Sequence, residues 1–365
     1  GRWFLTPFIA YPLFRGGPRR RAARAAPAPG GGGGARPHFP HESGLRASMT
    51  SRDPGTPGAG APGTAPRCGY VTLLGAPNAG KSTLLNALVG EELSIVTSRP
   101  QTTWRRITGI LTAGSTQLVF LDTPGVVAGR SLLDRSLLHS VRKAVREADV
   151  LVLLMDPRAP LGGAERAALA GIAAEAPAPG IGVVNKVDAV RSPAVEAEAR
   201  WLAGEGVSEV YRVSARKRTG LGVLLDALRR RLPPGPFLFP ADEIASAPER
   251  FFVGEIVRGA IFEQYSDELP YASICSVGEM RDTEGGRRYV QVTVYVERAS
   301  QKGILIGRGG RAIRRLGTAA RRRIEDFLGG PVYLDLWVKV LPGWRKKPAE
   351  LRRFGLPVPR AERPP

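Results

Sequence analysis

The chain has few of the residues that build disulfide frameworks and metal centres. It contains two cysteines, Cys68 and Cys275, which lie far apart and form no CxxC pair, and its three histidines show no metal-ligand spacing. So few thiols argue against a domain held together by disulfides and against a zinc site. They favour a protein of a reducing compartment. No apolar run approaches the roughly 20 residues that span a bilayer. We therefore expect a soluble protein.

Acidic residues are also scarce relative to basic ones. Lysine and arginine number 53 against 33 aspartates and glutamates, which gives a net charge of +20. A balance this basic favours a polyanionic partner, either nucleic acid or an anionic membrane surface.

The first 48 residues are rich in arginine, glycine, proline and alanine, and Glu42 is their one acid. An Arg-rich leader of this kind is typical of an organelle transit peptide, which leaves a plastid or mitochondrial matrix as one location. Because the segment lacks a sustained amphipathic pattern, we favour Met49 as the initiator of a cytoplasmic protein. Residues 1–66, which end in a Pro/Gly-rich stretch, are predicted to form a disordered or targeting extension.

Residues 67–235 alternate apolar strands with helical segments. Strands are expected near 70–74, 116–121, 150–155, 181–184 and 210–213, and helices near 82–89, 132–147, 164–175 and 222–231. This alternation predicts an α/β domain with a mostly parallel sheet and helices on both faces.

A smaller α+β unit is predicted at 249–342, after a linker at 236–248. Its expected order is a helix, two strands, two helices and a closing strand, and residues 289–296 show the alternation of a half-buried strand. A basic tail is expected at 343–365.

A glycine loop at 75–82 matches the phosphate-binding consensus G-x-x-x-x-G-K-[ST] between a predicted strand and a predicted helix. Glycines let backbone N–H groups wrap around phosphate oxygens, and the following helix adds the partial positive charge of its N-terminus. Lys81 would reach the β- and γ-phosphates, and the Ser82 hydroxyl would bind Mg²⁺. The predicted nucleotide contacts in this loop are Gly75, Ala76, Pro77, Asn78, Ala79, Gly80, Lys81 and Ser82.

The base is predicted to bind at 185–188, after another strand. An aspartate there can accept hydrogen bonds from guanine N1–H and the exocyclic amine, whereas adenine would leave the carboxylate unpaired. The carboxyl edge of a parallel sheet is also where ligands bind. We therefore predict a guanine pocket formed by Asn185, Lys186, Val187, Asp188, Ser214 and Ala215.

Between these motifs lies the predicted switch. Asp122 would hold Mg²⁺ through a water, and the Gly125 amide would sense the γ-phosphate. Either Thr102 or Thr103 should cap Mg²⁺ in the GTP state, and the sequence leaves open which one. The predicted catalytic set is Lys81, Thr102, Thr103 and Gly125; the metal set is Ser82, Asp122, Thr102 and Thr103; Thr123, Pro124 and Val126 complete the nucleotide contacts.

Val126 stands where many GTPases of this architecture have a water-orienting glutamine. We therefore expect slow GTP hydrolysis, or help from a cation or a partner. Asn78 is a candidate ligand for a potassium ion beside the phosphates, with a loop-bracing hydrogen bond as the equal alternative. The expected cofactors are GTP and Mg²⁺, with K⁺ as a candidate.

The glycine loop at 307–310 fits the GxxG loop of a KH domain, which clamps four single-stranded nucleotides. The apolar residues expected to floor a base groove are Ile304, Leu305, Ile306, Ile313 and Leu316. The predicted RNA-binding residues are Ile306, Gly307, Arg308, Gly309, Gly310, Arg311, Arg314 and Arg315. The basic-aromatic stretch at 336–347 could stack bases or touch anionic lipid, or could be a strand followed by a solvated tail.

From about residue 70 to residue 355 the chain resembles the Era family of GTPases. The resemblance is carried by GAPNAGKSTLLNALVG at 75–90, PQTT at 100–103, DTPGVV at 122–127, NKVD at 185–188, ELPY at 268–271, the GxxG region and LWVKVLPGW at 336–344. It implies GTP-dependent binding to small-subunit ribosomal RNA near its 3′ end, a role in 30S subunit assembly and peripheral association with membranes. Trp104 departs from the family, which usually has arginine after the paired threonines, so the fine behaviour of the switch is open.

Two other classes remain: a GTPase of another translation-factor class, and an RNA-binding protein whose nucleotide site is purely structural. The second domain argues against the former, and the intact Lys81, Ser82, Asp122 and Asp188 argue against the latter. Measurable GTP turnover would separate them. We expect a monomer.

Overall fold

The computed structural model describes residues 45–46, 65–97, 99–126, 129, 131–177, 180–207 and 209–359. The predicted extension at 1–66 lies almost wholly outside the described residues. Those from 65 onward belong to one compact unit.

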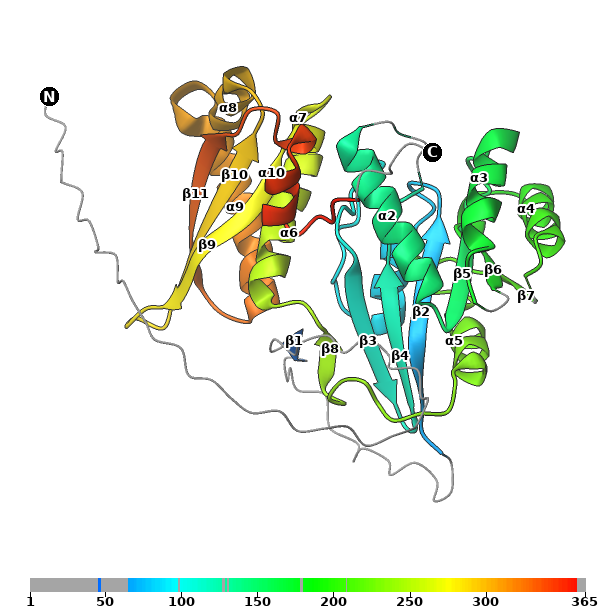
Figure 1. The fold of residues 1–365 in the computed structure, drawn as a ribbon. Helices are drawn as coiled ribbons and strands as arrows, with labels where there is room; N and C mark the ends of the chain where they lie inside the picture. Colours follow the sequence, from blue (N-terminus) through cyan, green and yellow to red (C-terminus); the bar gives the residue numbers. More distant parts are fainter. Residues whose placement is uncertain are drawn as a thin grey trace, which may run out of the picture. The chain divides into compact units, whose positions relative to one another are not determined.

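The first domain is built on an eight-stranded sheet with the order β1-β8-β3-β4-β2-β5-β6-β7 (Figure 1). Its strands are β1 (Leu45–Arg46), β2 (Arg67–Gly75), β3 (Ile107–Ala113), β4 (Thr116–Asp122), β5 (Val150–Met155), β6 (Ile181–Val184), β7 (Glu209–Arg212) and β8 (Glu243–Ala245). β4, β2, β5, β6 and β7 run parallel, whereas β3 pairs antiparallel with both β4 and β8. The predicted mostly parallel sheet is confirmed.

Helices cover both faces of this sheet, because each face of a buried parallel sheet is apolar. One core lies under α1 (Lys81–Val89) and α5 (Leu221–Arg231). The other lies under α2 (Leu132–Arg146), α3 (Gly163–Ala173) and α4 (Ser192–Gly204). β3 and α4 were not among the predicted elements.

The segment 236–248, predicted as a linker, contributes a strand to the first domain. The buried Gln117 side chain accepts hydrogen bonds from the amides of Leu238 and Phe239 at 2.8 and 3.0 Å and donates one to the Phe239 carbonyl at 2.9 Å. β8 follows and pairs with β3 at Ala245 and Gly109. The linker prediction is wrong for this segment. The amide side chain of Gln117 satisfies the backbone hydrogen-bonding groups of Leu238 and Phe239 and so fixes the segment to the first domain.

The second domain has the predicted α+β order. Its elements are α6 (Glu249–Gln264), α7 (Leu269–Ala272), β9 (Ile274–Asp282), β10 (Arg288–Val296), α8 (Ala299–Ile306), η2 (Arg308–Gly310), α9 (Arg311–Leu328) and β11 (Val332–Val340). β10 lies between antiparallel β9 and parallel β11. Every second residue of β10 from Val290 to Val296 is fully buried, in the core that the sheet shares with α6 and α9 (Figure 1).

The segment predicted as a basic tail is folded as far as residue 359. It forms η3 (Trp344–Lys346) and α10 (Pro348–Arg353). The Trp344 ring is completely buried, and its Nε1 donates to the Ala272 carbonyl at 3.0 Å. Leu351 and Phe354 are buried beside it. The aromatic residues of this segment serve packing, because their apolar area is removed from water.

Some classes of site do not occur among the described residues. Cys68 and Cys275 are buried and form no disulfide. No group of three or more His, Cys, Asp or Glu side chains there could hold a metal ion by itself, and no described helix is both long and apolar enough to cross a bilayer.

Candidate functional site

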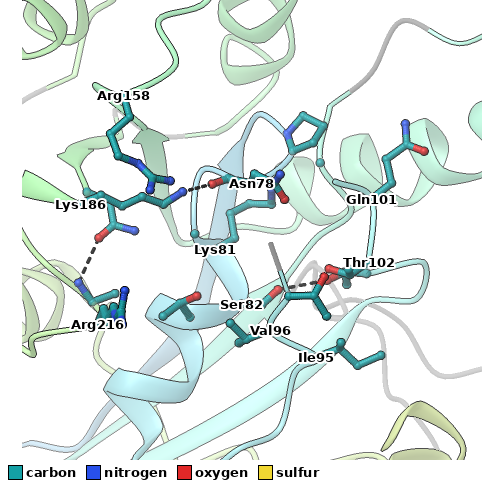
Figure 2. Close-up of a pocket in the computed structure, with 18 of the residues that line it drawn as sticks. Asn78, Lys81, Ser82, Ile95, Val96, Gln101, Thr102, Arg158, Lys186 and Arg216 are labelled. Carbon is teal, nitrogen blue, oxygen red and sulfur yellow. Dashed lines mark hydrogen bonds between the residues drawn. The ribbon is translucent and has the colours of Figure 1, made fainter. Parts of the chain in front are cut away.

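A cavity of about 640 Å³ opens at the carboxyl edge of the parallel strands, between the phosphate loop and the base loop (Figure 2). The predicted residues that line it are Pro77, Asn78, Gly80, Lys81, Ser82, Thr102, Thr103, Thr123, Gly125, Asn185, Lys186, Asp188 and Ala215. The other predicted nucleotide residues do not line it: Gly75, Ala76, Ala79, Asp122, Pro124, Val126, Val187 and Ser214. They belong to the loops and strand ends that carry the lining residues.

The phosphate loop joins β2 to α1, as predicted. Gly80 has φ +97°, and a Cβ added there would lie 2.3 Å from the Asn185 Nδ2, so glycine is required on two counts. The Lys81 Nζ donates to the carbonyls of Gly75 and Ala76 at 3.1 and 2.9 Å. Burial lowers the pKa of Lys81 to about 8, and the nearby Lys186 charge acts in the same direction. A bound phosphate group would favour the charged form of this amine and raise its pKa.

Three hydroxyl groups converge on one carboxylate oxygen beside the loop. The Asp122 Oδ2 accepts from Ser82 at 2.7 Å, from Ser94 at 3.0 Å and from Thr103 at 3.4 Å, and the Ser82 and Thr103 hydroxyl oxygens are 3.1 Å apart. The Asp122 Oδ1 is buried without a hydrogen-bond partner in the described structure. Burial raises the pKa of Asp122. Mg²⁺ prefers oxygen ligands, and these hydroxyl and carboxylate oxygens, one of them without a hydrogen-bond partner, fit that preference.

Ser94 was missed by sequence reasoning. The side chain of Asn86 in α1 fixes it: Asn86 Oδ1 accepts from the amides of Leu93 and Ser94 at 3.1 and 2.9 Å, and its Nδ2 donates to the Ser94 carbonyl at 2.9 Å. The available signal was an asparagine within the apolar stretch 84–89 of this helix, which predicts a backbone partner for its side chain.

The two switch threonines occupy different environments. Thr103 is buried and touches both Ser82 and Asp122, whereas Thr102 is half-buried and its carbonyl accepts a hydrogen bond from Arg258 of α6. Gly125 lies against the phosphate loop, since a Cβ there would come within 2.7 Å of the Pro77 backbone.

The base loop is tied to the phosphate loop by one buried asparagine. Asn185 Nδ2 donates to the Ala79 carbonyl at 3.1 Å, and its Oδ1 accepts from the Ala215 amide at 3.0 Å. Asp188 is exposed at the cavity wall, and a hydrogen bond from the Ser214 hydroxyl lowers its pKa. The carboxylate is thus ionised, and because it is exposed it can accept further hydrogen bonds from a base.

Two further residues of this site were missed. Asp156, after β5, accepts from the Lys186 Nζ at 2.7 Å and binds Arg158 through both carboxylate oxygens, at 3.2 and 3.0 Å. Burial opposes the ionised form of Asp156, but the hydrogen bonds from Arg158 and Lys186 outweigh it and lower the pKa. Lys186 also donates to the Asn78 carbonyl (Figure 2). Arg158 lines the cavity wall beside Lys186.

The GxxG loop lies between α8 and α9. Gly307, Gly309 and Gly310 all have positive φ, and a Cβ on Gly307 would lie 2.6 Å from the Ala312 Cβ. The exposed arginines here are Arg308, Arg311, Arg314 and Arg315, and Arg314 Nη2 braces the loop by donating to the Gly309 carbonyl at 3.0 Å.

The apolar residues around this loop divide into two groups. Ile304 is 57% exposed, and Ile306 and Ile313 are half-buried. Leu305 and Leu316, which were expected to floor a groove, are fully buried in the domain core instead, because they face the sheet.

Two protein families match the two domains. A family described as 50S ribosome-binding GTPase matches residues 70–186, and a KH domain family matches residues 278–345. Together with the fold and the cavity, these matches define a phosphate-loop GTPase followed by a KH domain.

Full-length relatives narrow this class. GTPase Era of Carboxydothermus hydrogenoformans is 38% identical over 291 residues, which cover 79% of this chain and 97% of the relative. GTPase Era of Nitratidesulfovibrio vulgaris is 40% identical over 301 residues, covering 80% and 98%. The chain belongs to the GTPase Era family, and it is a GTP-hydrolysing enzyme.

Solved structures agree with this assignment. The structure of a variant of Aquifex aeolicus Era bound to GDP·AlF4⁻ is 32% identical, with a TM-score of 0.76, and covers 79% of this chain and 99% of that one. Era in complex with MgGDPNP and nucleotides 1506–1542 of 16S ribosomal RNA has the same identity and TM-score and covers 80% and 99%.

Proposed function

We propose that this protein is a monomeric, Mg²⁺-dependent GTP switch that binds 16S-type ribosomal RNA near its 3′ end and acts in assembly of the small ribosomal subunit. The observation that carries the proposal is the presence of both sites, a guanine-nucleotide cavity and a GxxG loop, in one compact unit. A relative with this domain pair holds MgGDPNP together with 16S ribosomal RNA.

In this proposal Mg²⁺ is held by the Ser82 and Thr103 hydroxyls and, through water, by Asp122. Thr103 is preferred to Thr102 because its hydroxyl already lies 3.1 Å from Ser82. When bound, the ion neutralises charge on the β- and γ-phosphates. Lys81 orients the phosphates, and the Gly125 amide senses the γ-phosphate.

Hydrolysis is proposed to be slow, because Val126 cannot orient the attacking water. Asn78, on the cavity wall, is proposed as a ligand for K⁺ beside the phosphates. Single-turnover hydrolysis measured in K⁺ and then in Na⁺ tests this. A rate at least severalfold higher in K⁺ is expected, and equal rates would refute the cation ligand.

The RNA proposal is tested with a labelled single-stranded RNA that copies the 3′ end of 16S ribosomal RNA, in GDP and then in a non-hydrolysable GTP analogue. We expect tighter binding with the analogue. Arg308→Asp combined with Gly309→Asp should abolish it, because acids would replace the phosphate contacts while Gly307, which the fold needs, stays.

A matched control is Arg322→Asp with Gly329→Asp at the far end of α9. Arg322 is exposed, and Gly329 has positive φ with open space around it, as Gly309 does. The control makes the same charge change and should bind RNA like the parent. Equal weak binding by all three proteins in both nucleotides would overturn the RNA assignment.

The subunit partner and the location need separate tests. Co-sedimentation with purified small and large subunits should show binding to the small subunit, and preference for the large one would instead favour a 50S-type GTPase. We further propose a cytoplasmic protein with peripheral contact to anionic membranes, supported by the excess of basic over acidic residues, which persists from Met49 onward. Retention on phosphatidylglycerol vesicles but not on phosphatidylcholine vesicles is expected, and loss from both would refute the contact.

A further inference from the structure

The loop at 101–105 contacts the metal site with one side chain and the KH domain with the next. Thr103 reaches Ser82 and Asp122, while Trp104 is buried against Trp344 of η3, with ring centroids 5.7 Å apart. The Trp104 Nε1 donates back to the Gln101 carbonyl at 2.9 Å, which closes a tight turn around the threonines.

Arg258 of α6 binds the same loop from the KH domain. Its side chain is 1% exposed, and the guanidinium carbon lies 4.9 Å from the Trp104 ring centroid and 5.4 Å from that of Phe262. The guanidinium Nη2 donates to the Thr102 carbonyl. The backbone before Thr103 and the ring after it are therefore both held by one KH-domain side chain.

Glu255, one turn earlier in α6, fixes this guanidinium. Its carboxylate accepts from the Arg258 Nε at 3.1 and 3.2 Å and from the Arg105 Nη2 at 3.2 Å. Burial opposes the ionised form of Glu255, but the charges of Arg258 and Arg105 outweigh it and lower the pKa, so this carboxylate remains ionised. Arg105 also lies over the Phe251 ring, 4.5 Å from its centroid.

Stability alone does not account for this buried cluster. The Arg258 Nη1 is buried without a hydrogen-bond partner among the described residues. An unsatisfied buried guanidinium nitrogen costs free energy, and buried ion pairs are commonly no more stabilising than apolar side chains of the same volume. Their best-attested use is to fix one of two arrangements, which suits a loop that must hold and release a ligand.

We propose that Arg258 and Trp104 are positioning residues through which the KH domain holds Thr103 at the metal site. This inference rests on the proposed Mg²⁺-GTP switch. Only the GTP state uses Thr103, so the clamp stabilises the GTP complex selectively and leaves GDP affinity nearly unchanged. By linkage, GTP bound at the cavity favours the clamped arrangement of the two domains to the same extent.

The test compares Arg258→Gln with the parent by titrating GDP and a non-hydrolysable GTP analogue at saturating Mg²⁺. We expect the preference for the analogue over GDP to fall about tenfold, within the range of typical coupling between sites. Trp104→Phe, which keeps an aromatic ring over Arg258 but removes the Nε1 hydrogen bond, should lose less. Arg323→Gln, which breaks an exposed pair with Glu263 of α6, is the matched control and should keep the full preference.

A double-mutant cycle separates positioning from general destabilisation. In a Thr103→Ala background the analogue preference is already lost, so Arg258→Gln should lower it no further. An additive effect, or an equal loss of GDP affinity, would overturn the inference. If the parent itself showed no Mg²⁺-dependent preference for the analogue, the proposed switch would fail instead.

Discussion

The two glycine loops of this protein each lead into a helix, α1 and α9, yet they are built in opposite ways. In the GTPase domain, Lys81 is buried and its loop is tied to Asn185. In the KH domain, Arg308 and Arg315 are exposed. Their loop is braced by exposed side chains, since Arg314 donates to the Gly309 carbonyl at 3.0 Å and Arg311 to the Arg308 carbonyl at 3.4 Å. The first loop recognises one ligand through buried polar groups, whereas the second attracts a polyanion through screened surface charge.

This contrast sets the size of mutational effects. A buried donor or acceptor that loses its partner costs its full desolvation free energy, so few changes in the GTP cavity are tolerated. Each surface arginine contributes only a small, salt-dependent part of the binding free energy for a polyanion. The expected effects therefore decrease from the base loop to the RNA loop.

The largest change in base preference is expected at Asp188, the residue predicted to recognise guanine. Asp188→Asn should lower GDP affinity by about 100-fold or more, because an amide cannot accept from both guanine N–H donors. The same variant should gain affinity for xanthosine diphosphate, whose 2-carbonyl accepts from the new amide. Competition titrations of the two nucleotides measure this, with Asp226→Asn, at an exposed position of α5, as the control. An unchanged preference for guanine would place the base elsewhere.

Gly80 tests the tight coupling of the phosphate loop to the base loop. Gly80→Ala should lower the free energy of unfolding by about 3 kcal/mol and abolish nucleotide binding, since the added Cβ would meet Asn185 at 2.3 Å. Gly90 has nearly the same φ, +94°, but open space around it. Gly90→Ala should therefore cost only the backbone strain, about 1–2 kcal/mol. Equal losses in chemical denaturation would show that strain, and not the contact, requires glycine at position 80.

Sequence reasoning succeeded where one local motif encodes one backbone conformation. The stretch from Gly75 to Ser82 and the stretch from Gly307 to Gly310 each specify a loop between predictable elements, and both loops occur as predicted. The fold class and the GTPase class followed from these motifs and their order along the chain.

The residues that were missed act through distant partners. Ser94 joins the metal site because Asn86 holds its backbone, and Asp156 joins the base loop because Lys186, in the loop after β6, reaches it. The stretch that leads into β8 is held by the buried Gln117, and the folded C-terminal segment is held by the burial of Trp344. Composition suggested linkers and tails at these places, since tertiary contacts leave no local pattern in a polar or Pro-rich stretch.

A smaller effect concerns the protonation of Lys81. Its pKa is about 8 in the free protein, and a bound phosphate favours the charged amine and raises that pKa. Below pH 8 the amine is charged in both states, so affinity should be flat with respect to this group. Above pH 8 binding takes up a proton, and GDP affinity should fall by up to about tenfold per pH unit. Calorimetry in two buffers of different ionisation enthalpy should detect proton uptake on GDP binding at pH 8.5 but little at pH 7. No proton uptake at either pH would contradict the lowered pKa of the buried Lys81 amine.

The smallest single effects are expected at the RNA loop, where they sharpen the contrast between the two sites. Removing one phosphate contact with Arg315→Gln should weaken RNA binding only a few-fold and reduce the slope of log affinity against log salt by about 0.7, the value for one contact to a single strand. Arg322→Gln, at the far end of the same helix, should leave the slope unchanged. GDP affinity of both variants should match that of the parent at every salt concentration. A loss as large as that of Asp188→Asn would mean that the arginine is enclosed by RNA and desolvated, and the two loops would then recognise phosphate in the same way.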